Sequence, residues 1–228
     1  MSRAIVLATV LAFLAFASLP ATAQTAPGAA EINAFQGLHR AAHVNDVGAI
    51  GRLAASGADV NARVRGRTPV HVAAFASNEA ALDALARAGA DMNALDGDAY
   101  DAVTIAAVAN DVELMSRALA LGNSAGNVTS RYDGTALIAA AHLGHAEVVR
   151  RLIEAGAPLN HVNNLGWTAL IEAVILGDGG PNHVATVRAL VEAGANRSIA
   201  DRQGATPLMH AKARGYAAIQ RLIEAAGR

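Results

Sequence analysis

Residues 135–159 read TALIAAAHLGHAEVVRRLIEAGAPL and contain one complete helix–turn–helix unit. Thr135 opens a short alanine-rich helix over residues 136–142, and Gly144 turns the chain. A second helix follows, and its apolar residues recur at helical spacing: Val148, Val149, Leu152 and Ile153. Gly156 then ends this helix, because glycine readily adopts the positive φ that closes one. The stretch predicts two short helices that pack against each other.

Variants of this unit recur along the chain from about Gln36. The residues that open the first helices are Thr68, Asp101, Thr135, Thr168 and Thr206, at intervals of 33, 34, 33 and 38 residues. The glycines that close the second helices are Gly57, Gly89, Gly122, Gly156, Gly194 and Gly227, at intervals of 32, 33, 34, 38 and 33 residues. The two series predict six stacked units, joined by segments that project as hairpins. The excess length falls in the fifth unit, between its two helices.

The openings of two units resemble the Thr-Pro-Leu-His motif of the ankyrin family. They read Thr68-Pro69-Val70-His71 and Thr206-Pro207-Leu208-Met209. The threonine hydroxyl is suited to cap a helix, and proline fits the first helical position, where no hydrogen bond is lost. The resemblance covers about residues 34–226 and is most specific in GWTAL…GDGGP of the fifth unit, where the chain looks like a bacterial ankyrin subfamily. It implies an all-α ankyrin-repeat solenoid of stacked helix–turn–helix units with projecting β-hairpin loops.

These patterns divide the chain into three parts. Residues 1–23 are a predicted signal peptide, residues 24–35 a disordered lead-in and residues 36–228 the repeat domain. The predicted units span about residues 36–66, 67–99, 100–133, 134–166, 167–204 and 205–228. The terminal units should be caps with one polar outer face, because each lacks a neighbour on that side. The irregular segment 122–130 (GNSAGNVTS) is expected to be the loosest joint in the stack.

The N-terminus has the pattern of a secretory signal. Arg3 supplies a positive charge, residues 4–19 are apolar, and Ala21-Thr22-Ala23 matches the small-x-small site of signal peptidase. Cleavage before Gln24 would export the mature chain, in a bacterial cell to the periplasm, with no membrane insertion afterwards. The alternative is an uncleaved anchor, since the apolar run falls just short of a bilayer span.

Composition narrows the classes of function. Lysine and arginine total 18 against 19 aspartate and glutamate residues, so no basic excess is present to neutralise nucleic-acid phosphates. The absence of cysteine excludes disulfides, a thiol nucleophile and thiolate metal sites. No nucleophile elbow, phosphate loop, dinucleotide fingerprint or HExxH pair occurs in the sequence. We therefore expect a non-enzymatic protein without a cofactor, and no nucleic-acid partner.

The hairpins and the outward positions of the first helices should form a concave binding face. Tyrosine, tryptophan and arginine are enriched at binding hot spots. The residues predicted to contact a protein partner are Arg131, Tyr132, Asp133, Asn163, Asn164, Trp167, Glu172, Asp178 and His210. The alternative for Trp167 is local packing onto the adjacent hairpin. Two further hairpins carry charge of a single sign, for which plain solvation is the alternative: Arg63, Arg65 and Arg67 in the first, Asp96, Asp98 and Asp101 in the second.

Three of these predicted contact residues mark unusual features of the last two units. Glu172 and His210 replace the hydrophobic or small residues at equivalent first-helix positions, such as Val72 and Ala139, and should point into the groove. Asp178 lies in the insertion GDGGP, whose glycines and proline are suited to form a rigid loop with exposed backbone donors. The alternative is a tolerated surface insertion, because extending a loop costs little entropy.

These observations predict a monomeric periplasmic scaffold that binds another protein through its hairpin tips and concave helix face. The competing hypothesis is a small-ligand or metal-dependent protein centred on the fifth unit. The residues that prompt it are His142, His145, His161, His183, Glu172 and Asp178. Their spacing argues against a metal centre, since His145 and His183 fall at equivalent turn positions, where the ankyrin pattern has histidine for structural reasons.

Export gives a direct test of the N-terminal signal. Mass spectrometry of the protein from the secreted fraction should find an N-terminus at Gln24. A membrane-retained chain that begins at Met1 would identify the segment as an anchor instead.

Overall fold

The structure is a computed structural model that describes residues 25–225, and the predicted signal peptide (1–23) lies outside this range. The first helices of the units are α2 (Gly37–His43), α4 (Pro69–Phe75), α6 (Ala102–Ala109), α8 (Ala136–Leu143), α10 (Ala169–Ile175) and α12 (Pro207–Ala213). The second helices are α3 (Val47–Ala55), α5 (Glu79–Arg87), α7 (Val112–Ala120), α9 (Ala146–Glu154), α11 (Pro181–Glu192) and α13 (Ala217–Ala225). A further helix, α1 (Ala29–Ala34), precedes them. The described part of the chain is all-α, which confirms the predicted fold class.

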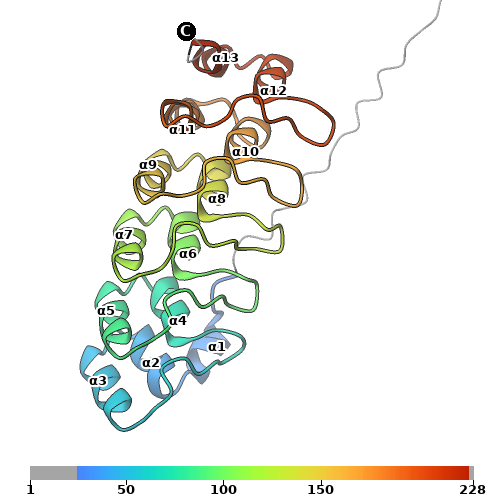
Figure 1. Cartoon of the computed structure of the whole chain (residues 1–228). Helices are drawn as coiled ribbons and strands as arrows, with labels where there is room; N and C mark the ends of the chain where they lie inside the picture. Colours follow the sequence, from blue (N-terminus) through green and yellow to red (C-terminus); the bar gives the residue numbers. More distant parts are fainter. Residues whose placement is uncertain (1–24, 226–228) are drawn as a thin grey trace, which may run out of the picture.

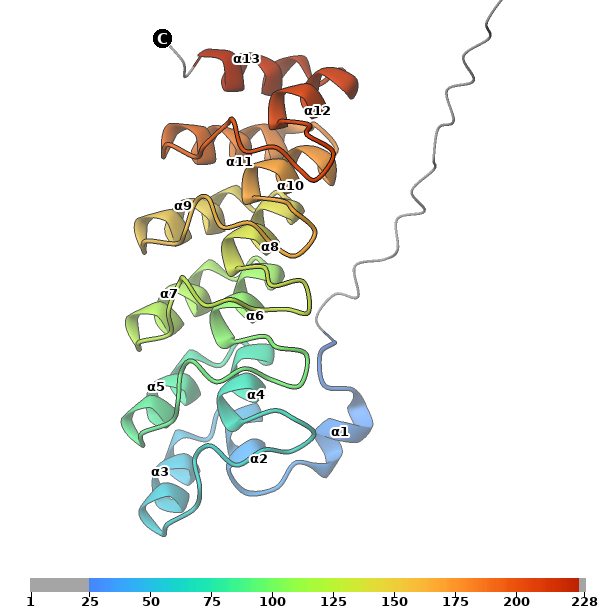
Figure 2. The ribbon, with the colours of Figure 1, turned by 45° about the vertical axis from the view of Figure 1, so that its right-hand side comes forward.

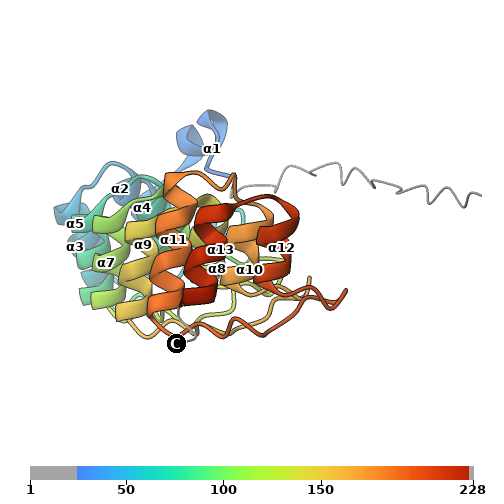
Figure 3. The ribbon, with the colours of Figure 1, turned by 90° about the horizontal axis from the view of Figure 1, so that it is seen from above.

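The helices form two layers that run the length of a curved stack (Figure 1). First helices line one layer and second helices the other, and each antiparallel pair, here called a unit, packs on the next. The loops between units project on the side of the first helices (Figure 2). Viewed along the stack, the second helices and the projecting loops lie on opposite sides of the first helices (Figure 3). This is the predicted solenoid.

The predicted openers cap the first helices. The side chain of Thr135 accepts a hydrogen bond from the Ile138 amide, and Asp101, Thr168 and Thr206 make the same contact in their units. Thr68 forms a capping box with His71, whose Nε2 lies 3.0 Å from the Ala94 carbonyl in the next hairpin. Burial lowers the pKa of His71, which keeps the ring neutral. The opener motif therefore starts a helix and ties it to the following unit.

Polar side chains at the turns between paired helices bind each unit to the one before. Asn78 Nδ2 donates to the Ala42 and His43 carbonyls at 2.9 and 2.8 Å. His145 Nδ1 lies 2.9 Å from the Ala107 carbonyl, and His183 Nε2 lies 3.0 Å from that of His142. The predicted structural role of His145 and His183 is confirmed.

A single apolar core follows the stack. Its fully buried large side chains include Ile50, Leu82, Leu85, Ile105, Leu114, Met115, Leu137, Leu152, Leu170, Ile171 and Leu190. Helices of seven to nine residues are too short to be stable alone, so this shared core stabilises them. In the central unit, Val148, Val149 and Leu152 are buried as predicted, whereas Ile153 is only partly buried.

The N-terminal part of the chain departs from expectation. Residues 24–35 were expected to be disordered, but residues 29–34 form α1, and Phe35 has no exposed surface. Alanine and glutamate favour a helix there, and Ile32 gives it an apolar contact with the core. The prediction of disorder was wrong because it rested on the small residues of this stretch and left out its two large apolar residues, Ile32 and Phe35.

The segment 122–130 is not the loose joint that its composition indicated. Asn123 is buried and donates to Asp101 Oδ2 at 2.8 Å, while its own oxygen accepts from the Val103 amide. Asn127 donates to Asn93 and to Asp101, both at 2.9 Å. Side-chain amides therefore replace regular backbone pairing and connect the third unit to the second.

The end units have largely polar outer faces, as expected of caps. Arg40, Asn45 and Arg52 are exposed in the first unit, and Arg221 and Glu224 in the last. The exceptions are Val44 and Val47 in the first unit, 53% and 38% exposed, and Met209 in the last, 55% exposed. Within residues 25–225, no helix has both the length and the hydropathy needed to cross a bilayer.

Leu152→Ala tests the packing of the central unit. Leu152 has no exposed surface, so its truncation should lower the free energy of unfolding by roughly 2–5 kcal/mol in chemical denaturation. The matched control, Arg151→Ala, alters an exposed residue of the same helix and should cost less than about 1 kcal/mol. Equal stability of the two variants would show that the buried face of α9 is assigned wrongly.

Candidate hairpin and groove surface

One side chain organises the base of each of three hairpins. Asp96, Asn163 and Asp201 each stand five residues before a helix opener. The Oδ1 atom of each accepts two backbone N–H groups, from the residues two and four positions later, at 2.9–3.0 Å. Asn163 is buried by this arrangement. Its predicted role as a partner contact is therefore wrong, because its side chain is enclosed in its own hairpin.

Neighbouring hairpins are bonded to each other. The Ser130 amide donates to the Ala99 carbonyl at 2.7 Å, and the Asn164 amide donates to the Tyr132 carbonyl at 2.9 Å. Asn164 Nδ2 also donates to the Arg131 carbonyl at 3.0 Å, and Arg202 donates to the Asn164 carbonyl. These bonds join the second to fifth hairpins (residues 96–100, 130–133, 163–167 and 201–205) into one continuous edge.

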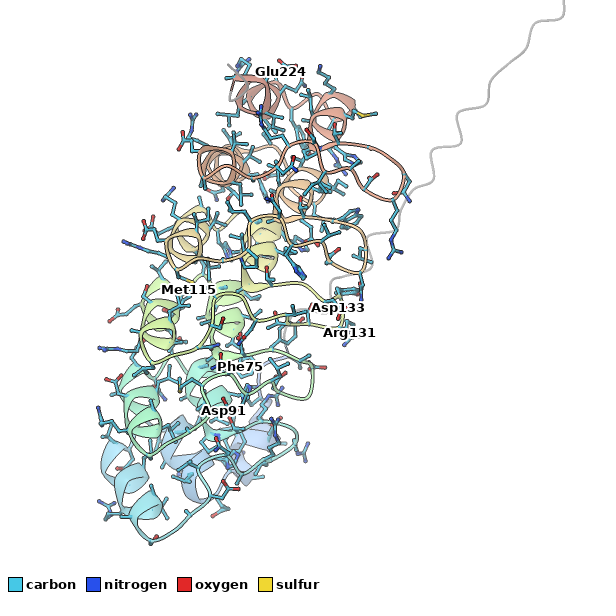
Figure 4. The ribbon with its side chains drawn as sticks, viewed as in Figure 1. Phe75, Asp91, Met115, Arg131, Asp133 and Glu224 are labelled. Carbon is cyan, nitrogen blue, oxygen red and sulfur yellow. The ribbon has the colours of Figure 1, made fainter. Side chains whose placement is uncertain are left out.

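Most of the predicted hairpin residues lie on the surface of this edge. Arg131 and Asp133 stand at the outer end of the third hairpin (Figure 4). Tyr132 is 37% exposed, Asn164 is exposed, and Trp167 is partly buried. The structure thus places Tyr132 and Trp167 on adjacent, directly bonded hairpins.

The single-sign charge clusters are paired across hairpins. Arg67 Nε lies 3.9 Å from Asp96 Oδ2, and Arg131 Nη2 lies 3.7 Å from Asp98 Oδ1. Arg63 donates to the Gly66 and Leu95 carbonyls, both at 2.7 Å. One residue of each cluster therefore pairs with the other cluster, Asp98 pairs with the third hairpin, and Arg63 is bonded to backbone carbonyls.

Glu172 and His210 occupy the same place in successive units, four residues after the opener. Glu172 is only 6% exposed, and its Oε1 accepts from Asn163 Nδ2 at 2.8 Å. His210 Nε2 donates to Asp201 Oδ2 at 2.7 Å and is partly exposed. Both side chains bond a helix to the base of its hairpin. The expectation that Glu172 points into the groove is wrong, since the hairpin base covers it, whereas His210 keeps part of its surface.

The electrostatics around Glu172 follow from burial. Burial raises the pKa of Glu172 to about 7, against the hydrogen bond from Asn163, which favours the ionised form. His142 Nδ1 lies 3.6 Å from Glu172 Oε2, and burial, with the charge of His183, lowers the pKa of His142. Near neutral pH the Glu172 carboxyl is therefore partly protonated, and burial favours the neutral imidazole of His142.

The insertion of the fifth unit is held from both sides. Asp178 Oδ1 accepts from the Gly180 amide at 2.8 Å and from His183 Nδ1 at 2.9 Å, and these two bonds lower the pKa of Asp178. The other ring nitrogen of His183, Nε2, lies 3.0 Å from the His142 carbonyl. On the other side, the Tyr216 hydroxyl donates to the Gly177 carbonyl at 3.0 Å.

Glycine is required where the insertion meets Tyr216. Gly179 has a φ of +71°, and a Cβ at this position would lie 2.5 Å from Cδ1 of the Tyr216 ring. The insertion thus connects the fourth, fifth and sixth units. Asp178 keeps an exposed side chain, but its carboxylate is engaged in this loop.

The chain is similar in sequence and in structure to known proteins. Two family models match the chain. The model for ankyrin repeats (3 copies) matches residues 103–199, and the model for ankyrin repeats (many copies) matches residues 38–86. A solved ankyrin repeat domain from Acinetobacter baumannii is 44% identical, with a TM-score of 0.78 over 83% of this chain and 97% of that one. The chain belongs to the ankyrin-repeat family. Ankyrin repeats are non-enzymatic modules, and membership implies a scaffold for protein–protein interaction.

Two further relatives extend the comparison. The ankyrin repeat domain of Bcl-3, a member of the IkappaB protein family, is 27% identical, with a TM-score of 0.74 over 85% of this chain and 87% of its own. An Escherichia coli (strain K12) protein named as an ankyrin repeat protein, YahD, is 34% identical over 102 residues, which are 44% of this chain and 51% of YahD. The chain therefore spans about half the length of that curated relative.

Two exposed leucines at the ends of first helices were not predicted from the sequence. Leu143 and Leu176 follow their openers by eight residues, at the ends of α8 and α10, and are 40% and 42% exposed. Alanine or arginine takes the equivalent place at Ala76, Ala109 and Arg214. An alignment of the units by their openers would have found both leucines, because large apolar residues are unusual at an exposed helix end.

The metal-centred alternative gains no support from the fifth unit. Within residues 25–225, no group of three or more histidine, aspartate or glutamate side chains is arranged to hold a metal ion. His142, His183 and Asp178 are instead bonded as part of the repeat stack.

Glu172→Gln tests the buried carboxyl. The pKa of Glu172 is about 7 in the folded chain and near 4.5 when unfolded, so the unfolded chain loses this proton first as pH rises. The stability contributed by neutral Glu172 is therefore full below about pH 4.5 and is lost as pH rises to about 7, by roughly 3 kcal/mol. Glutamine stays neutral and still accepts from Asn163, so the variant should be more stable than wild type at pH 8 and equal to it near pH 4.

Urea unfolding between pH 4 and 8 measures this difference. His142 is present in both chains, so its opposite pH dependence cancels to first order. Glu154→Gln, an exposed carboxyl on α9, should follow the wild-type profile. Parallel profiles for Glu172→Gln and wild type would show that Glu172 is ionised in the folded chain.

Proposed function

We propose that this chain is a monomeric periplasmic scaffold that binds another protein through its third and fourth hairpins and the exposed ends of α8 and α10. Export rests on the pattern of residues 1–23, with an apolar run and an Ala-Thr-Ala site. Binding rests on the ankyrin family, whose repeats are interaction modules, and on the exposed apolar residues that adjacent units of this chain carry.

The observation that supports this location is a set of large apolar side chains on adjacent units. Tyr132 and Leu165 are each 37% exposed on bonded hairpins, and Leu143 and Leu176 are 40% and 42% exposed on neighbouring first helices. Trp167, which lies between Leu165 and Leu176 in the sequence, is partly exposed. Exposed large apolar groups on a rigid frame are typical of partner surfaces, because little conformational entropy is lost on binding.

The polar residues of the same hairpins suit the rim of such a surface. Arg131 and Asp133 flank Tyr132, and Asn164 neighbours Leu165. Bonds between hairpins fix their backbones, the Asn164 side chain is bonded to the Arg131 carbonyl, and Arg131 pairs with Asp98, so these polar groups face a partner from a rigid frame. Asp178 and His210 lie at the margins and already have partners within the chain.

Tyr132→Ala combined with Trp167→Ala tests the proposal. Affinity capture from the native periplasm should recover a partner with the wild-type chain, and the double variant should bind at least thirty-fold more weakly, equivalent to a loss of about 2 kcal/mol. Far-ultraviolet circular dichroism and melting temperature should stay nearly unchanged, because neither residue lies in the core.

The matched control is Val44→Ala combined with Val47→Ala, which removes two exposed apolar side chains from the first unit. It should retain the partner. Lost binding together with a lowered melting temperature would mean that the two rings only pack the hairpins. Full retention of binding by the Tyr132 and Trp167 variant would place the partner elsewhere on the stack.

A further inference from the structure

Residues 25–35 lie against the hairpin side of the first two units. The figures place α1 beside α2 and α4, on the side away from α3 and α5 (Figures 2 and 3). The segment is thus outside the two helix layers, beside the first helices. It does not continue the stack.

Arg67 binds this segment. Its Nη1 donates to Glu31 Oε1 at 2.6 Å, and its Nη2 donates to the Thr25 carbonyl at 2.5 Å. The guanidinium also lies 5.2 Å from the centre of the Phe75 ring, at the end of α4. Arg67 is only 8% exposed, and Glu31 is nearly buried with it. The arginine is therefore enclosed between the segment and the groove.

Of the two carboxylates near Arg67, that of Glu31 forms the closer ion pair. Asp96 is 3.9 Å from Arg67 Nε, and its Oδ1 is already engaged by two amides of its hairpin. Glu31 makes the short ion pair, and a buried guanidinium is costly unless it is paired. Releasing the segment would leave Arg67 to be solvated beside Phe75.

Two apolar residues attach the rest of the segment. Phe35 has no exposed surface, and its ring centre lies 6.0 Å from those of both His39 and His43. Ile32 packs on the core from α1. Glu31, Ile32 and Phe35 therefore form a short pattern, Glu-Ile-x-x-Phe, whose members all contact the first two units.

The repeat positions that this segment covers match those exposed further along the stack. Arg67 directly precedes the opener Thr68, as Trp167 precedes Thr168. Phe75 follows Thr68 by seven residues, as Ile175 follows Thr168. The segment thus occupies on the second unit the positions that border the proposed partner surface on the fifth.

We propose that residues 25–35 are an intramolecular ligand that covers the face of the first two units around Arg67 and Phe75, and that this face recognises a short helix with the pattern Glu-Ile-x-x-Phe. The inference rests on the proposed function in one respect, because it limits a protein partner to the third to sixth units while the segment is bound. A partner that presents the same acidic and apolar pattern would open the full groove by displacing the segment.

The test compares the full chain with its Glu31→Arg variant. The probe is a fluorescein-labelled peptide of residues 25–35, TAPGAAEINAF. In the wild type, a tethered segment has an effective concentration near the millimolar range and should exclude the peptide. In Glu31→Arg, where two positive charges oppose each other, the peptide should bind at least ten-fold more tightly than to wild type, as measured by fluorescence anisotropy.

Hydrogen exchange supplies the second measurement. The amides of residues 32–35 should exchange at least ten-fold faster in Glu31→Arg than in wild type, while those of α8 and α9 stay unchanged. Glu113→Arg is the matched control, since Glu113 is also an acid in the first turn of its helix but is exposed, and it should behave as wild type. Glu31→Gln, which removes only the charge, should give an intermediate result if Glu31→Arg disturbs the first unit.

Two outcomes would overturn the inference. One is unprotected exchange of residues 32–35 in the wild type, and the other is unchanged protection and no peptide binding in both Glu31 variants. The assay contains no partner protein, so its failure leaves the result for Tyr132 and Trp167 standing, and failure of that result leaves this one standing.

Discussion

The whole molecule depends on the contact between one helix pair and the next. Most of its helices have seven to nine residues, which is too few for independent stability, and each unit has more apolar surface than its own two helices cover. Stacking solves both problems at once. Because each layer is completed by its neighbours, the fold has one long core, and its first and last layers must be finished in other ways. Polar residues serve at both ends, and α1 lies beside the first.

Side-chain hydrogen bonds give this stacking a fixed register. Apolar packing alone tolerates sliding, whereas Asn78, His145 and His183 bond particular carbonyls near the end of the preceding first helix, two for Asn78 and one for each histidine. At the hairpins, the pairs Asn163–Glu172 and Asp201–His210 fix the loop to its helix. The same polar groups that prompted a binding or metal hypothesis from sequence are used for this purpose, which is why a buried carboxyl and several histidines occur in a protein of a non-enzymatic family.

The fold was predictable because its signals are local and repeated. The Thr135 unit shows a capping residue, an apolar face and a closing glycine, and each recurs at nearly constant spacing. The site was predictable only in part. Position in a hairpin indicated that Arg131, Tyr132 and Asn164 are exposed, but the burial of Glu172 depends on Asn163, nine residues earlier, and on the way the hairpin folds back over the helix. The position of residues 25–35 against the first two units depends on Arg67, which lies more than thirty residues later in the sequence. No periodicity reports such pairings, because they involve single side chains and not a repeated pattern.

The insertion in the fifth unit gives the solenoid a mechanical polarity. Pulled at its ends, a stack of nearest-neighbour layers is expected to come apart one layer at a time, beginning with the layer held by the fewest bonds. His183 fastens the fifth layer to the fourth, and Tyr216 fastens the sixth to the insertion of the fifth. A layer bound on both sides does not leave alone. The fifth and sixth layers should therefore separate from each other only when the bond from Tyr216 to the insertion breaks, in addition to the hairpin bonds that link layers elsewhere in the stack.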